Sequence, residues 1–412
     1  MATLDAAPSR SVFRHRDFTL YQVARLCAVL AVQIESVAIG WQVYELTGSA
    51  LALGYTGLAQ FLPFLAFALL GGQLADRVDR RAILVVCQGV MLLCSLLLLA
   101  FTLGHIRDVR FVYGVLVLFG TARAFHAPAG SALTPHLVPP EELTRAVAVN
   151  STTWQVATIG GPAVGGILYG WAGATGAYAV SASLCALSVL WILLLRVRTG
   201  SVSSEPLSFA TLVAGLRFVR QQRLLLGSIT LDLFAVLLGG AVALLPIYAR
   251  DVLHTGPWGL GLLRGAPALG AALVAVVLAV RPMGGRAGWK MFVSVAIFGA
   301  ATLVFGVSRS LPLSLLALAV AGAADMVSVV VRHTLELVAT PDDMRGRVGA
   351  VNMMCIGASN ELGEFRAGGF AEHVGAVPAV VAGAVGTLVV VGLWAWLFPE
   401  LRRVDRLEST RR

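Results

Sequence analysis

Long apolar stretches and short polar breaks alternate along almost the whole chain. A helix needs about 20 apolar residues to cross a membrane. Twelve stretches meet this need: residues 18–44, 50–74, 82–104, 111–130, 143–170, 173–195, 224–248, 258–280, 291–307, 311–331, 348–371 and 378–398. Lipid offers no partner for backbone N–H and C=O groups, so isolated spans of this length form helices. The pattern therefore predicts an all-α membrane protein with twelve transmembrane helices.

The break between the second and third stretches carries the densest charge. From Asp76 to Arg81, five of six residues are charged. A single charge at the centre of a span costs about 2.5–3.5 kcal/mol on insertion scales, so this segment is predicted to be a hairpin at a membrane surface. A small residue followed by Asp-Arg and a basic pair is more than orientation requires, although a loop that only orients the chain stays open as an alternative.

Basic residues divide unevenly between the two sides of the predicted membrane. Alternate loops place 23 of them on the side of this hairpin and both termini, and only 4 on the other side, at Arg107, Arg110, Arg250 and Arg309. Short loops rich in Lys and Arg stay in the cytoplasm. We therefore expect a multi-pass protein of the bacterial inner membrane with both termini in the cytoplasm.

One long break in hydrophobicity divides the spans six and six. Within it, Leu212, Leu216 and Val219 recur at helical spacing beside basic residues, which is typical of a helix lying on a membrane surface. The expected organisation is a six-helix bundle over residues 1–195, a cytoplasmic linker with an amphipathic helix over 196–223, and a second six-helix bundle over 224–412.

The two halves are related in sequence. The run from Arg145 to Asn150, Arg-Ala-Val-Ala-Val-Asn, recurs 202 residues later as Arg-Val-Gly-Ala-Val-Asn, ending at Asn352. Each copy opens the fifth span of its half. Parallel six-span repeats place a substrate site between the halves near the midplane. The same offset aligns Arg123 with Asp325, which gives opposite charges at equivalent positions.

The composition narrows the classes of function. Of 412 residues, 58% are hydrophobic and 13% charged, against about 25% charged in soluble domains. The net charge of +9 is scattered over short loops, which argues against nucleic acid as a partner. The five cysteines lie in apolar stretches without a CxxC pair, and no phosphate-binding Gly-Lys-Ser/Thr run occurs. We expect no metal site, no cofactor and no enzymatic activity, with a proton gradient as the energy source.

Residues 72–81 resemble the signature that the major facilitator superfamily carries between spans two and three, and the resemblance extends over essentially the whole chain. Asp79 stands where the signature usually has glycine, as in the exporter branch that includes enterobactin and macrolide efflux proteins. Residues 16–18 and 40–49 are also similar to that branch. The resemblance implies that charges of the signature hold the cytoplasmic side shut while the cavity faces outward. The residues of this expected gate are Gly72, Asp76, Arg77, Arg80 and Arg81.

The run Gly161-Pro162-Ala163-Val164-Gly165-Gly166 in the fifth span resembles the antiporter motif of exporters in this superfamily. Physically, Pro162 removes a backbone donor and bends the helix, while the glycines let a neighbouring span approach closely. A packing seam of small residues is the simpler interpretation. The resemblance favours export over import.

Charged and titratable residues inside spans are costly, and they are therefore candidates for binding protons or substrate. In the family that the chain resembles, spans one, four, seven and ten line the cavity. The candidates are Glu35, Arg123, His126, Asp232, Asp325, Glu361, Glu364 and Arg366. Arg25 and Arg264 also lie in spans, and Arg25 is near enough to the surface to extend its head into water.

Carboxyl groups and one histidine suit proton transfer. Burial favours the protonated form of a carboxyl such as Glu35, unless that carboxylate is held in a buried ion pair. Glu361 and Glu364 share one helix face, and two neighbouring carboxylates should not both ionise. His126 lies one turn from Arg123, where it suits either proton transfer or a packing role.

Taken together, these patterns predict a secondary transporter that exports a small organic molecule, drug-like or siderophore-like, in exchange for protons by alternating access. The expected partners are the substrate, protons and the lipid bilayer, and the expected state is a monomer. Two alternatives stay open. One is a symporter or uniporter, including a metal-ion exporter, and the other is a membrane receptor or scaffold that transports nothing.

Overall fold

The computed structural model describes residues 12–197, 209–281, 284–341 and 344–405. These residues form helices and turns, with no strand among them. The first half contains η1 (Val12–Arg14), α1 (Arg16–Thr47), α2 (Ala50–Arg77), α3 (Arg80–Leu103), α4 (Val109–Leu133), η2 (Thr134–His136), η3 (Pro140–Glu142) and α5 (Leu143–Leu193). The remaining elements are α6 (Phe209–Gln221), α7 (Arg223–Gly239), η4 (Val242–Leu244), α8 (Leu245–Ile247), η5 (Tyr248–Val252), α9 (Gly256–Val280), α10 (Ala287–Val307), α11 (Leu311–Ala339), α12 (Arg345–Val374), α13 (Ala376–Leu397) and α14 (Pro399–Arg402).

Twelve membrane spans are distributed over these helices. Ten helical segments of the described chain are long and apolar enough to cross a membrane. One of them contains two spans, because Gly173 interrupts α5 with a left-handed backbone (φ 65°). The twelfth span is α12, whose apolar character is diluted by Glu361, Glu364 and Arg366. The all-α, twelve-span fold predicted from the sequence is confirmed.

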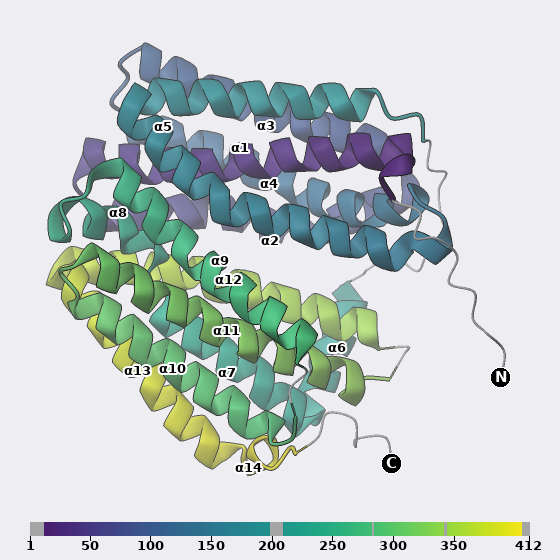
Figure 1. Cartoon of the computed structure of the whole chain (residues 1–412), viewed down its shortest axis with the longest axis vertical. Helices are drawn as coiled ribbons and strands as arrows, with labels where there is room; N and C mark the ends of the chain where they lie inside the picture. The colour runs from purple at the N-terminus through teal and green to yellow at the C-terminus, as the bar shows by residue number, and fades with distance from the viewer. Residues whose placement is uncertain (1–11, 198–208, 282–283, 342–343, 406–412) are drawn as a thin grey trace.

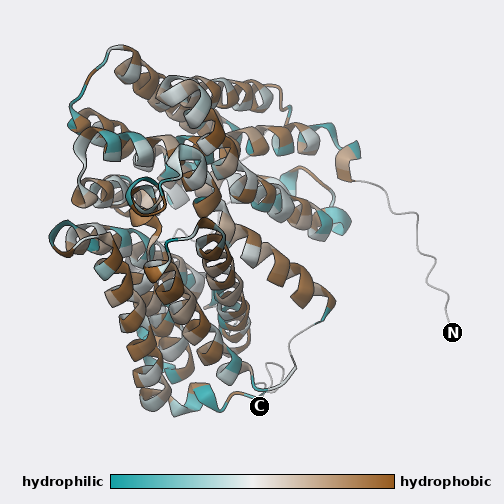
Figure 2. Cartoon of the chain, turned by 60° about the vertical axis from the view of Figure 1, so that its left-hand side comes forward, coloured by the Kyte–Doolittle hydropathy of each residue, from teal (hydrophilic) through white to brown (hydrophobic). Residues whose placement is uncertain are grey.

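The spans form two bundles, with α1–α5 in one and α7–α13 in the other (Figure 1). The short helix α6 lies between them in sequence and packs on the second bundle, where Val219 is buried with Leu225 and Val348. Apolar residues, brown in Figure 2, make up much of the helices in both bundles. Large side chains such as Val86, Val280 and Trp396 are exposed there. Apolar patches of this extent require a lipid surrounding.

Glycines at equivalent positions bring helices together in both bundles. A Cβ atom on Gly120 of α4 would lie 2.1 Å from the carbonyl oxygen of Gln60 in α2. A Cβ atom on Gly322 of α11 would lie 2.0 Å from the carbonyl oxygen of Pro267 in α9. Only glycine permits such close backbone contact. Because these glycines are separated by the 202-residue offset of the sequence repeat, the two bundles share one packing scheme.

The same symmetry governs the contacts between the bundles. Gly166 of α5 packs on Gly261 of α9, with 3.0 Å between an added Cβ and the Cα of Gly261. Gly368 of α12 packs on Gly54 of α2, with a corresponding 3.1 Å. Gly166 and Gly368 are again 202 residues apart. The two bundles therefore meet through two equivalent glycine crossings.

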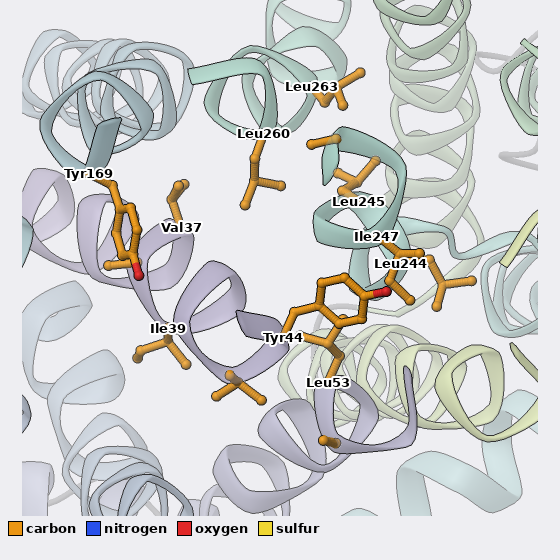
Figure 3. Packing of buried hydrophobic residues seen from close by; sticks show 14 of the residues in the cluster. Val37, Ile39, Tyr44, Leu53, Tyr169, Leu244, Leu245, Ile247, Leu260 and Leu263 are labelled. Carbon is orange, nitrogen blue, oxygen red and sulfur yellow. The ribbon is translucent and has the colours of Figure 1, made fainter. Parts of the chain in front are cut away.

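The two ends of the molecule differ in how the bundles meet. We call the end where α2 turns into α3, near Arg77 and Arg80, the hairpin end, and the end where α1 turns into α2, near Gly48, the opposite end. A single hydrophobic core at the opposite end contains residues of both bundles, including Val37 and Leu260 (Figure 3). At the hairpin end the described residues form separate cores within each bundle. In Figure 1 the bundles accordingly diverge toward the hairpin end.

Span seven is discontinuous, whereas the sequence predicted one uninterrupted helix over 224–248. α7 ends at Gly239, and the chain continues through the 3-10 turn η4, the short α8 and the π-helical η5. The last carbonyl groups of a helix lack partners. Arg366 of α12 is the hydrogen-bond donor to two of these carbonyl groups. Its Nε donates to the carbonyl oxygen of Leu237 (2.9 Å) and its Nη2 to that of Leu238 (2.6 Å). Broken helices of this kind are tolerated at membrane depth only when protein groups satisfy the freed backbone.

Candidate functional site

A polar cavity of about 420 Å³ lies between the two bundles, near the middle of the spans. Residues of α1, α2, α3, α4, α5, α9 and α12 line it, with η4 at one side. Its charged or titratable lining consists of Glu35, Arg123, His126, Arg264, Glu361 and Glu364. The cavity thus brings together five of the eight residues that the sequence singled out for protons or substrate. It leaves out Asp232, Asp325 and Arg366.

Glu35 enters the cavity wall from α1 and is buried. Its Oε2 accepts hydrogen bonds from the hydroxyl groups of Ser95 in α3 (2.6 Å) and Ser181 in α5 (2.8 Å). Among the described contacts of Glu35 there is no ion pair, so the sequence-based alternative of a locked ion pair is wrong. Two hydroxyl donors hold the carboxyl in place without a compensating cation. The serines are uncharged residues in apolar stretches, so no sequence pattern marked them as partners of Glu35.

Glu361 and Glu364 converge on Gly57 of α2. A Cβ atom on Gly57 would lie 2.7 Å from Oε2 of Glu361 and 3.3 Å from Oε2 of Glu364. The two carboxyl oxygens are therefore within about 6 Å of each other by that geometry. Arg123 exerts an electrostatic attraction on Glu361, and Arg264 exerts one on Glu364. This carboxyl pair sits at the contact between α2 and α12, so its charge acts on the interface between the bundles.

Arg264 reaches from α9 across to the first bundle. Its Nη1 donates to the hydroxyl group of Ser36 in α1, and its Nη2 lies 3.1 Å from the Cβ position of Gly40. Its Nε has no hydrogen-bond partner, and the same is true of Oε1 of Gln88 and Oγ1 of Thr158. All three residues line the cavity. Buried polar atoms are normally paired, so these vacant donors and acceptors suit a polar ligand.

Arg123 and His126 face the cavity from α4. The guanidinium of Arg123 lies over the ring of Phe64, 5.6 Å from its centroid, in a cation–π contact. The side-chain amide of Gln88 lies 3.2 Å from Nε2 of His126. An amide N–H₂ that donates to this nitrogen requires the neutral imidazole. Arg123 is therefore the cation that α4 offers to the cavity.

The three excluded candidates have other surroundings. Asp232 of α7 forms a buried ion pair with Arg332 of α11. Arg332 lies within α11, which extends to Ala339, whereas the apolar pattern of the sequence ended the tenth span at residue 331. Arg366 caps α7, as described above. No hydrogen bond or ion pair between described residues joins Arg123 to Asp325, so the structure leaves their pairing untested.

The hairpin signature is held mainly by its own bundle. Asp79 caps α3 by accepting from the backbone N–H of Arg81 (3.2 Å), which explains an acidic residue where a glycine is usual. Arg80 donates to the carbonyl oxygens of Ala75 and Ala132 (both 3.3 Å). Arg81 donates to that of Leu193 at the end of α5 (2.6 Å).

The two other charges of the expected gate are placed differently. Arg77, in the last turn of α2, is exposed. The side chain of Asp76 lies outside the part of the chain that the structure describes, so its expected gate contacts stay a prediction. Gly72 lies within α2, one turn before the end of the helix.

The exporter-like motif lies where three helices meet. Gly161 and Gly165 face α1, and Cβ atoms on them would lie 2.6 Å from Cβ of Gln33 and 2.9 Å from Cα of Ile34. Gly166 faces α9 of the other bundle, as described above. The carbonyl oxygen of Pro162 lies 2.4 Å from the Cβ position of Gly261. The motif therefore serves both as a packing seam within one bundle and as a contact between bundles beside the cavity.

Two pseudo-equivalent six-helix bundles around a polar cavity define a membrane transporter of the major facilitator fold. The chain belongs to the transmembrane secretion effector family, whose family model matches residues 7–412. It is 26% identical over 397 residues to the enterobactin exporter EntS of Citrobacter koseri, covering 94% of this chain and 93% of the relative. It is 25% identical to EntS of Escherichia coli over the same length and with the same coverage.

Solved transporters share the fold at lower sequence identity. A POT family transporter in complex with 5-aminolevulinic acid superposes with a TM-score of 0.77 at 11% identity, covering 94% of this chain and 96% of that one. A bacterial homologue of the lysosomal transporter Spinster, in an inward-facing and occupied conformation, gives 0.73 at 15% identity, covering 96% and 98%. These similarities establish the fold alone.

Proposed function

We propose that the protein exports a small organic molecule across the bacterial inner membrane by alternating access. The observation that carries this proposal is the polar cavity, because it lies between bundles that share one core at the opposite end and separate cores at the hairpin end. The strong excess of basic residues on the hairpin side favours a cytoplasmic hairpin end and cytoplasmic termini. The described conformation then corresponds to a cavity directed toward the cytoplasm, ready to take up cargo for export.

The cargo we infer is siderophore-like, with a drug-like molecule as the second choice. The named relatives export enterobactin. In this chain the cavity offers an unpaired donor on Arg264 and unpaired acceptor capacity on Gln88 and Thr158, together with the exposed cation of Arg123. A ligand with both hydrogen-bond donors and acceptors, and with some negative charge, matches this lining better than an apolar one.

Export in exchange for protons is the second part of the proposal. Glu35 is a buried carboxyl without a cation, and Glu361 and Glu364 lie close together at the bundle interface. Two such carboxyls do not both ionise readily. Both carboxyl groups line the cavity, so a hydrogen-bond donor of the cargo that binds the ionised member of the pair would compete with a proton for the same carboxylate. Proton uptake by the carboxyl pair and release of the cargo would then be linked.

The test uses purified protein in liposomes, with enterobactin as the first probe and a fluorescent organic cation as the second. Where the cytoplasmic face points outward, an acidic lumen should drive the probe inward, and collapse of the gradient should stop it. The double variant Glu361→Gln/Glu364→Gln keeps the side-chain size and should lose this response. Glu400→Gln, which removes an exposed carboxyl on the same bundle, should keep it.

Other outcomes favour the alternatives. Transport that ignores the pH gradient indicates a uniporter, and transport in the same direction as protons indicates a symporter. A flux of iron or manganese ions with no flux of either organic probe indicates metal-ion export. Binding of a partner protein without transport of any probe indicates a receptor or scaffold.

A further inference from the structure

A second group of buried charged residues lies away from the cavity, within the second bundle toward the hairpin end. It consists of Asp232 on α7, Arg332 and Glu336 on α11, and Asn352 on α12. All four are buried, with exposed fractions between 1% and 8%. Arg332 pairs with Asp232, and Nδ2 of Asn352 donates to Oε2 of Glu336 (2.9 Å). The group therefore ties three helices together through ionic and polar contacts.

The first bundle contains an uncharged counterpart at the equivalent positions. Thr134 and Asn150 precede Glu336 and Asn352 by 202 residues, and Nδ2 of Asn150 donates to Oγ1 of Thr134 (3.0 Å). Oδ1 of Asn150 also accepts from the amide of Gln22, so both ends of this amide are paired. The first bundle thus shows what a fully satisfied version of the contact looks like.

The second bundle lacks that completeness. Oδ1 of Asn352 has no hydrogen-bond partner, although the residue is only 1% exposed, and Nε of Arg332 has none either. A carboxylate accepts hydrogen bonds and cannot donate one. With a proton on Glu336, its O–H group becomes the donor that Oδ1 of Asn352 lacks. The exchange of a hydroxyl at Thr134 for a carboxyl at Glu336 creates a site whose hydrogen bonds depend on a proton.

The charge balance leads to the same point. Two carboxylates, Asp232 and Glu336, surround one guanidinium, that of Arg332, which attracts both. An uncompensated charge in a low-dielectric interior is costly. Within this group of four buried side chains, a proton on Glu336 removes the second negative charge, and opening of the site to water lowers the cost in another way. The site can therefore hold a proton in one conformation and release it in another.

Glu336 also has a route to water. Nδ1 of His333, one turn earlier on α11, lies 3.8 Å from Oε2 of Glu336, and the His333 side chain is 53% exposed. Further charged or titratable groups on α12 and on the helices that adjoin α11 and α12 are Arg345, Arg347 and Cys355 on α12, Arg217 and Arg220 on α6, and Lys290 on α10. Arg345 donates to the carbonyl oxygen of Leu337, and Lys290 to that of Gly284. Arg217 and Arg220 are exposed.

We propose that Glu336 is a proton-binding site of the transport cycle, located outside the cargo cavity and present in the second bundle only. The proposal rests on the proton exchange proposed above. A proton from water adds to the carboxylate of Glu336 and leaves by the same route through His333. Because Glu336 joins α11 to α12, protonation changes the contact between a helix at the cavity interface and its neighbour. Cargo and this proton then occupy separate places in the molecule.

The first experiment measures the proton directly and needs no cargo. Infrared difference spectra of the full-length protein in lipid are recorded while the pH is changed, and the C=O band of protonated carboxyl groups is followed. The band of the parent protein should lose one component in Glu336→Gln and in Glu336→Thr, which installs the residue of the first bundle. Glu400→Gln should leave the band unchanged. An unchanged band in both Glu336 variants overturns the proposal.

The second experiment asks whether that proton drives transport of enterobactin in liposomes. One proton moving down one pH unit sustains about a tenfold concentration ratio, so removal of one proton site should lower the ratio at that gradient about tenfold. Exchange of cargo without a gradient should persist. Glu336→Asp should restore part of the gradient response.

A variant that loses its infrared component but keeps the full concentration ratio overturns the role of Glu336 in the transport cycle. Failure of the parent itself to respond to the gradient counts against the proposed function, whereas the infrared result stands independently.

Discussion

At the scale of single residues, the buried carboxyl groups differ in what surrounds them. Glu35 is held by two hydroxyl groups, Glu361 and Glu364 by each other and by distant guanidinium groups, and Asp232 by a direct ion pair. Removal of a carboxyl from an ion pair leaves a buried charge without compensation. Removal of the negative charge from a carboxyl that is held only by two hydroxyl groups leaves no charged partner behind. The surroundings therefore separate residues that hold the fold from residues that are free to change charge.

Substitution of Glu35 by Gln should abolish gradient-driven export while leaving binding of the cargo intact. Glutamine imitates the protonated acid and can still accept from Ser95 and Ser181, so the fold is expected to persist. Transport in liposomes with and without a pH gradient, together with thermal stabilisation by the cargo, measures the two effects. Ser183→Ala is the control, because the hydroxyl group of Ser183 donates to the carbonyl oxygen of Ala179 within α5 and does not contact Glu35. Undiminished gradient-driven transport by Glu35→Gln would assign proton coupling to the remaining carboxyls.

Glu372 provides a pH-sensitive contact outside the spans, at the opposite end. The backbone N–H of Leu51 (3.0 Å) and the hydroxyl of Ser49 (2.8 Å) donate to its Oε2, and these bonds hold the pKa of this carboxyl below its usual value. Stability from a lowered carboxyl pKa is present above the usual value, about 4.3, and is lost as the pH falls through the lowered value. The contact between the bundles is therefore expected to be complete at neutral pH and to weaken only in strong acid.

Substitution of Glu372 by Gln should weaken closure of the opposite end at neutral pH, because a neutral amide accepts more weakly than a carboxylate. Labelling of a single cysteine introduced beside Ser49 should become faster, and its acid sensitivity should disappear. Glu400→Gln is the control, since the Glu400 carboxyl pairs with Arg223 and this contact stays within one bundle. Equal labelling rates in Glu372→Gln and the parent would contradict this role.

At the scale of helices, glycine positions decide where the bundles approach each other. Gly166 and Gly368 lie at the two equivalent crossings between the bundles. Gly160 and Gly170 lie in α5, as Gly166 does, but no atom lies within 4 Å of a Cβ added to either of them. A methyl group is therefore tolerated at two of these positions and obstructed at the other two. This contrast separates an effect on the crossing from a general effect on helix α5.

Substitution of Gly166 by Ala should destabilise the described conformation by about 1–3 kcal/mol, the usual cost of overpacking. Because the crossing lies toward the opposite end, the variant should favour separation of the bundles there. Spectroscopic distance measurements between α5 and α9 report the shift, and Gly368→Ala should act in the same direction. Gly160→Ala and Gly170→Ala should resemble the parent. A normal distance distribution for Gly166→Ala would show that the crossing can relax.

The helices show which parts of the architecture could be predicted from sequence. Apolar length located all twelve spans, and the repeat located equivalent positions, because both signals are local. The break after Gly239 escaped prediction because its stabilising group, Arg366, comes from a different span. Glu336 was missed because the charged residues after residue 331 made the end of α11 look like a loop. The helix continues through Arg332 because the ion pair with Asp232 stabilises this charge inside the bundle. In the cavity, charged residues were found and the uncharged partners Ser95, Ser181 and Gln88 were not.

At the scale of the whole molecule, the two bundles meet at one end and diverge at the other. An exporter must also adopt the reverse arrangement, in which the hairpin ends approach each other. Arg123 and Asp325 occupy equivalent positions in the two bundles, on α4 and α11. A charge pair made in only one conformation shifts the equilibrium by its differential energy. These residues are candidates for a contact that forms only in the reverse arrangement.

Exchange of the two charges tests that contact. Arg123→Asp and Asp325→Arg should each reduce transport strongly, and the double exchange should recover part of it. Expression and thermal stability of each variant are measured in parallel, because Arg123 also contacts Phe64. A double variant no more active than the weaker single variant, at normal expression, would show that the two residues act independently.

The paired glycine crossings have a consequence for assembly. Gly166 on Gly261 and Gly368 on Gly54 are equivalent contacts, so each bundle contributes one copy of the same pair of glycine contacts to the interface. An interface of that kind is the one found in two-fold symmetric dimers. A chain cut between α5 and α6 and produced as two polypeptides should therefore reassemble in the membrane into an active complex. An ancestral single bundle would have needed only a second copy of itself.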